Sequence, residues 1–99
     1  MTKLTEKYEN NLKKDLQDPV EAAEYLNAAL EDGSQEVFLM ALKDVADAKG
    51  ISEIARTTNL NRENLYRIFS IQGNPKLKSL NSVLHSIGLK LSVQVENQL

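Results

Sequence analysis

Apolar residues recur at the spacing of α-helices through the first half of the chain. Residues three or four apart between Asp18 and Gly33 predict an amphipathic helix, which Asp18 caps and Pro19 begins. A second helix is predicted from Ser34 to Gly50. Its apolar residues occupy more than one side, so we expect a second cover, either the preceding helix or a partner protein.

The second half of the chain contains shorter periodic segments. Ser52 is predicted to cap a short helix that stops near Asn59, and Asn61 is predicted to cap another. A loop of turn-forming residues (70–76) and a helix over 77–87 follow. Residues 89–96 alternate apolar and polar side chains, which is the period of a β-strand. The pattern therefore predicts a mainly α fold of five helices and one C-terminal strand.

The N-terminal segment is polar and has no clear period. Leu4, Tyr8 and Leu12 lie four residues apart, which is compatible with either a helix or a docked arm. The chain has 99 residues, of which 41% are hydrophobic, and this suffices for one modest core. We therefore expect a single domain, with residues 1–17 as an N-terminal arm and residues 18–99 as its body.

The inventory of reactive side chains argues against catalysis. Cysteine is absent and there is one histidine, so we expect no disulfide, no Cys nucleophile and no metal site. No pairing of nucleophile and base emerges, which predicts a protein that is not an enzyme and has no cofactor. The longest apolar run is six residues, too short to span a membrane, and the N-terminus lacks a signal-peptide core, so we expect a cytoplasmic protein.

Charge is distributed unevenly along the chain. Residues 1–50 carry a net charge of −5, whereas residues 51–99 carry +3. Between residues 54 and 90, six basic side chains are opposed by a single acidic one, Glu63. This segment is a candidate face for a polyanion such as DNA, the alternative being a solvated surface whose sign varies along the chain.

Residues 51–69 fit the pattern of a helix-turn-helix. Ala55 is small enough for two helices to cross closely, and Asn59 tolerates the left-handed backbone of a sharp turn. Arginine, asparagine and tyrosine on the outer side of the second helix suit contacts with base edges and phosphates. The candidate DNA-binding residues are Ser52, Arg56, Asn61, Arg62, Glu63, Asn64, Tyr66, Arg67, Lys76 and Lys78.

Several blocks of the sequence together resemble a known family. They are AAEYLNAALEDG (22–33), ALKDVADAKGISEIA (41–55), LNRENLYRIFS (60–70), GNPKLKSL (73–80) and VLHSIGLKLSV (83–93). In order and spacing they are similar to the probable addiction-module antidote proteins, HigA-like antitoxins with a Cro/cI-type helix-turn-helix fold. Asn59 and Asn61 depart from the glycine and the serine or threonine expected there, but both are physically conservative.

The resemblance implies a function and two macromolecular partners. It implies an antitoxin that binds double-stranded operator DNA, represses its own operon and neutralises a RelE/ParE-like toxin. Alternatives are a stand-alone prophage-type transcriptional regulator without a toxin partner and a pure protein-interaction module. The toxin-binding surface is expected in the acidic first half, between Glu21 and Asp47.

The predicted C-terminal strand requires a partner, because an isolated strand is not stable in water. We expect it to pair with its counterpart in a second copy across a two-fold axis, giving a homodimer. Pairing with the toxin is the main alternative, and the arm around residues 3–8 is a weaker one. The residues expected at the dimer interface are Leu89, Leu91, Val93 and Val95.

Overall fold

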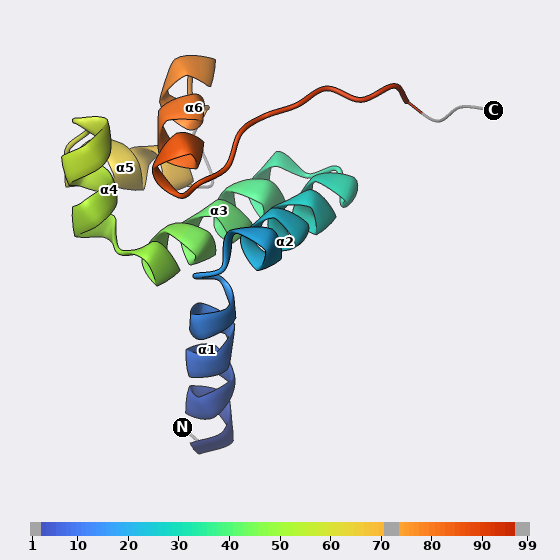
Figure 1. Cartoon of the computed structure of the whole chain (residues 1–99), viewed down its shortest axis with the longest axis vertical. Helices are drawn as coiled ribbons and strands as arrows, with labels where there is room; N and C mark the ends of the chain where they lie inside the picture. The colour runs from blue at the N-terminus through green and yellow to red at the C-terminus, as the bar shows by residue number, and fades with distance from the viewer. Residues whose placement is uncertain (1–2, 71–73, 97–99) are drawn as a thin grey trace.

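The computed structural model describes residues 3–70 and 74–96, and the side chains from residue 8 onward within them. This part of the chain forms six helices, with no strand assigned in it (Figure 1). The helices are α1 (Lys3–Asp15), α2 (Pro19–Glu31), α3 (Gln35–Lys49), α4 (Ile51–Thr58), α5 (Arg62–Phe69) and α6 (Leu77–Ser86). None of these six described helices is long and apolar enough to cross a membrane. The fold is therefore mainly α, as predicted.

Three of the four predicted helix caps are confirmed. The carboxylate of Asp18 accepts from the Val20 amide at 3.1 Å, and Pro19 is the first residue of α2. Ser34 caps α3 in the same way, and Asn61 caps α5. The predicted cap at Ser52 is wrong, because α4 begins at Ile51 and Gly50, with φ of 112°, joins α3 directly to α4.

The described residues form one helix more than the five predicted, and the additional helix is α1. Its residues are compatible with a helix or a docked arm, and the chain adopts the helix, which projects from the rest of the molecule in Figure 1. It is attached near its C-terminal end, where Leu16 is buried and Leu12 packs against the core. Helix α1 contacts α3, and the two leucines line a hollow together with Asp44 and Asp47 of α3.

Helix α3 lies at the centre of the fold. It contacts α1, α2, α4 and α5, and its fully buried side chains include Leu39, Leu42 and Val45. The predicted need for cover on more than one side is thus met within the chain, with α2 on one side and the C-terminal helices on another. Met40, next to Leu39 in sequence, nevertheless remains 56% exposed.

Residues 89–96 follow α6 as an extended segment rather than a strand. Gly88, with φ of 83°, ends the helix, and the segment then runs past α2 and α3 (Figure 1). No backbone hydrogen bond joins residues 90–96 to another described residue. The predicted C-terminal strand is therefore not confirmed, because the described part of the single chain offers no second strand to pair with it. The predicted loop before α6 includes residues 71–73, which lie outside the described residues.

Candidate nucleic-acid interface

The predicted pair of short helices is present as α4 and α5, which pack against each other. Asn59 takes φ of 62°, and it is the one non-glycine residue with positive φ in the described part of the chain. Thr58 stabilises the turn, because its hydroxyl donates to the Ile54 carbonyl at 2.7 Å and accepts from the Leu60 amide at 3.2 Å. Asn61 then caps α5 by accepting from the Asn64 amide at 2.7 Å. The crossing of the two helices is thus fixed by local hydrogen bonds.

The inner side of the pair is anchored in the core. Ile54 and Leu65 have no exposed surface, and Ile68 and Phe69 are buried beside them. Ala55 of α4 is half-buried and packs against the same core, and its small side chain is compatible with the close approach of α4 and α5. Because α5 contacts both α3 and α4, its orientation is set by the core.

The opposite side of α5 faces solvent. Tyr66 is 47% exposed, and the side chains of Arg67 and Glu63 are 71% and 84% exposed. Arg62 is exposed at the first position of α5, and Asn64 is half-buried. The chain therefore presents the outward side chains in the predicted orientation, and their part in DNA binding stays a prediction.

Two arginines on this face have neighbours that orient them. The Arg62 guanidinium donates to the hydroxyl of Ser52, which links the beginnings of α5 and α4. Arg67 donates to the Asn64 side-chain oxygen at 3.3 Å and lies 3.9 Å from the Glu63 carboxylate. An ion pair this exposed contributes little stability, so Arg67 can exchange it for a phosphate or a base edge.

The remaining predicted positions lie around this face without joining it. Arg56 is exposed in the last turn of α4, whereas Lys76 and Lys78 are exposed at the start of α6. Helix α6 packs against α4. No hydrogen bond or ion pair connects these three side chains to α5 within the described residues. Their expected contacts with phosphates stay a prediction.

Lys43 is a basic residue near this face that sequence reasoning did not select. Its ammonium donates to the Asp47 carboxylate at 3.0 Å, and this hydrogen bond is the main reason why the pKa of Lys43 is raised. Tyr66 of α5 makes a smaller contribution to the same pKa shift, which places the two residues within electrostatic range. Nothing local in the sequence indicates this, because the proximity depends on how α3 packs against α5.

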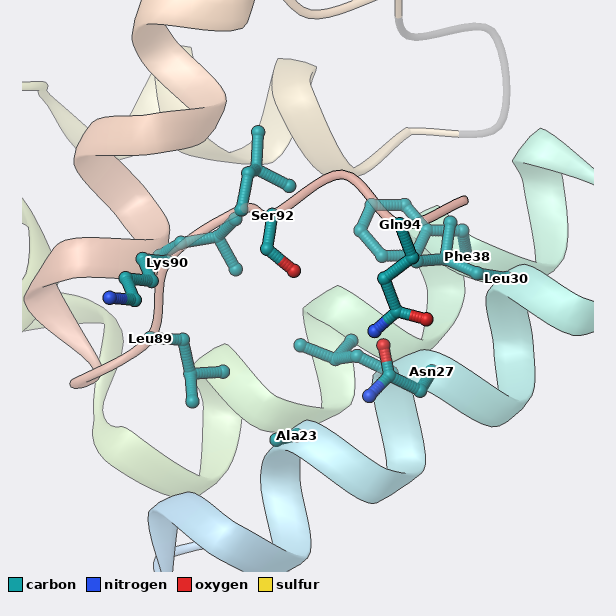
Figure 2. A pocket seen from close by; sticks show the side chains of 11 residues that line it. Ala23, Asn27, Leu30, Phe38, Leu89, Lys90, Ser92 and Gln94 are labelled. Atoms are coloured by element: carbon teal, nitrogen blue, oxygen red, sulfur yellow. The ribbon is translucent and has the colours of Figure 1, made fainter. Parts of the chain in front are cut away.

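The C-terminal segment covers a small hollow on the other side of α3. The hollow has a volume of about 150 Å³ and is lined by α2, α3, α6 and residues 89–92 and 94. Figure 2 shows Leu89 near Ala23, with Gln94 over Asn27. Leu89 is half-buried, and its amide donates to the Leu84 carbonyl at 2.8 Å.

The four predicted interface residues therefore differ in environment. Leu89 packs on its own core, and Leu91 is 40% exposed. Val93 and Val95 are 99% and 96% exposed, with no apolar cover from the described part of the chain. Two valines at alternate positions of an extended backbone leave an apolar edge available to another chain.

No group of three acidic, histidine or cysteine side chains in the described residues could hold a metal ion.

The chain is similar to a known protein family over most of its length. Residues 6–95 match the model of a family described as "Probable addiction module antidote protein". A relative from Haemophilus influenzae, described as an uncharacterized protein, is 39% identical over 70 residues, which cover 71% of this chain and 72% of the relative. No solved structure matches the chain. Because the family model spans nearly the whole sequence, the chain belongs to the probable addiction module antidote protein family.

Proposed function

We propose that this antidote protein binds double-stranded operator DNA through the outward face of α5, represses its own operon and neutralises a RelE/ParE-like toxin. The observation that carries the DNA-binding part is the two-sided character of α5. Leu65 and Ile68 fix one side in the core, whereas Tyr66 and Arg67 project from the other. A short helix held in this way can enter a major groove without disturbing the core behind it.

The chemistry of the exposed side chains suits a duplex. Arginine can make bidentate hydrogen bonds to guanine, and asparagine can do so to adenine. In this role Arg62, Arg67 and Asn64 contact base edges, and the Tyr66 hydroxyl donates to a phosphate oxygen. Ser52, Arg56, Lys76 and Lys78 contact the flanking backbone, and Glu63 and Asn61 orient their neighbours on α5. No step in this proposal requires a cofactor or a catalytic group.

A homodimer completes the proposal. The unpaired backbone of residues 90–96 and the exposed valines pair with the same segment of a second copy. To bind successive major grooves, such a dimer needs its two α5 helices on one side and about 34 Å apart. Pairing of the segment with the toxin in place of a second copy would appear as a monomer that becomes a one-to-one complex.

The DNA-binding part is tested with duplex from the region upstream of the chain's own coding sequence. We expect retention in a gel shift, with an affinity that falls steeply as salt rises because phosphate contacts release counterions. Arg67→Ala removes an exposed side chain without changing the core, so it is expected to weaken retention by about tenfold or more. Lys14→Ala, a change of the same charge on α1, is the matched control and should bind like wild type.

Three outcomes separate the candidate functions. Equal retention of Arg67→Ala and wild type would remove α5 from the interface. Absence of retention even at low salt, together with binding of the toxin, would favour a pure protein-interaction module. Retention of DNA together with no toxin binding would favour a stand-alone regulator. Circular dichroism of each variant shows whether the fold is intact.

A further inference from the structure

A groove between α2 and α3 is separate from the proposed DNA-binding face. Its volume is about 370 Å³, and we call it the α2–α3 groove. Its lining residues are Tyr25, Ala28, Ala29, Asp32, Val37, Met40, Ala41 and Asp44. None of them belongs to α4, α5 or α6, so occupation of the groove uses different residues from those proposed to contact DNA.

The centre of the groove is apolar and uncovered. Met40 is 56% exposed and Val37 is 38% exposed, although both belong to the helix that forms the centre of the core. The small side chains of Ala28 and Ala29 on α2 leave room above them. Methionine is a flexible side chain that adapts to different partner surfaces, and exposed apolar patches of this kind are typical of protein interfaces.

The rim of the groove is acidic. Asp32 and Asp44 are both exposed, and the Tyr25 hydroxyl donates to Oδ2 of Asp44 at 2.6 Å. This bond holds the Asp44 carboxylate in one position across the groove. Asp44 also lines a neighbouring hollow between α1 and α3, together with Glu9, Lys13 and Asp47. Asp47 forms an ion pair with Lys43, and the charge of Asp44 adds a smaller contribution to the raised pKa of Lys43. No basic side chain among the described residues lies within ion-pair distance of Asp32 or Asp44.

We propose that the α2–α3 groove binds a cationic segment of the toxin, with one apolar side chain seated on Val37 and Met40 and flanking lysine or arginine side chains paired with Asp32 and Asp44. This inference rests on the proposed function, which gives the antidote a toxin partner. The negative charge of the rim favours a cationic toxin segment over a second copy of this chain or DNA. A second copy would bring the same acidic rim face to face across a two-fold axis, and DNA would bring phosphates, so both would be repelled.

The probe is the protein encoded by the reading frame next to this chain's gene, co-expressed with the full chain. Binding is measured by calorimetry at low and high salt. Met40→Glu places a charge in the apolar centre and is expected to weaken binding by at least about tenfold. The double variant Asp32→Asn/Asp44→Asn is expected to weaken binding several-fold and to flatten its salt dependence. The amide that replaces the Asp44 carboxylate can still accept from the Tyr25 hydroxyl, so this variant changes charge and not packing.

Matched controls lie outside the groove. Leu77→Glu changes an apolar residue that is 65% exposed on α6, and Asp15→Asn/Glu31→Gln removes two exposed acidic charges. Both should bind the probe like wild type. Thermal melting checks that every variant folds.

The outcomes distinguish the inference from the function on which it rests. Binding by wild type together with undiminished binding by Met40→Glu would overturn the groove assignment alone. A Met40→Glu variant that dissociates into monomers would assign the groove to a second copy and would also overturn it. Failure of wild type to bind the probe would overturn the proposed neutralisation of a toxin, and the groove assignment with it.

Discussion

The turn between α4 and α5 depends on the backbone of one residue, and its contribution to stability can be measured. Asn59 has φ of 62° and ψ of 18°, which is the left-handed region that side chains with a Cβ generally avoid. Its own side chain is exposed and makes no hydrogen bond within the described residues. A substitution here therefore changes the cost of the backbone conformation and little else.

The expected magnitude follows from this conformation. An ordinary L-residue pays ~1–2 kcal/mol in the left-handed region, and asparagine pays less of this than alanine does. We expect Asn59→Ala to lower the free energy of unfolding by ~1 kcal/mol, and this corresponds to a drop in Tm of about 4–8 °C for a domain of this size. Asn59→Gly removes the Cβ penalty and, after the entropy of the unfolded chain is counted, should melt close to wild type.

The assay is thermal unfolding of wild type and both variants, followed by circular dichroism at one protein concentration. A melting temperature for Asn59→Ala equal to that of wild type would show that the turn is not under the constraint described. An equal loss in Asn59→Ala and Asn59→Gly would show that the asparagine side chain matters and not its backbone. Either result would refute the argument.

Further changes test the core, the α2–α3 groove and the C-terminal segment. Leu65→Ala opens a cavity at a side chain with no exposed surface, so urea unfolding should show a loss of ~2–5 kcal/mol; a loss under ~1 kcal/mol would mean that the site collapses around the smaller residue. Burial, followed by the hydrogen bond to Asp44, raises the pKa of Tyr25 from 10.0 to about 12. The folded state therefore holds this proton more tightly, and the stabilisation is present below pH 10 and is lost as pH rises toward 12. Wild type should lose ~1 kcal/mol more than Tyr25→Phe over this range, after allowance for solvent screening, and parallel pH curves would contradict this. Val93→Lys/Val95→Lys should sediment as a monomer where wild type sediments as a dimer, and an unchanged mass would exclude the segment as the interface.

Much of this fold can be predicted from residues that lie close together in the sequence. Asp18, Ser34 and Asn61 cap helices within three residues of their own position, so their effect can be predicted without knowing the rest of the chain. The turn at Asn59 is equally local, and the period of α5 separates Leu65 from Tyr66. The start of α4 differs from the prediction, because α3 and α4 meet at Gly50 without the intervening cap that Ser52 suggests.

Other features depend on contacts between distant segments, and only the tertiary structure decided them. The sequence leaves the form of residues 3–15 open; they form α1, and Leu12 and the following Leu16 pack on the core. The proximity of Lys43 to Tyr66 and the acidic rim shared by α2 and α3 arise from helix packing, which no local pattern encodes. Residues 89–96 have the alternation of a strand, but the described part of the chain forms no strand there. A strand needs hydrogen bonds to the backbone of another strand, whereas a helix makes its backbone hydrogen bonds within itself.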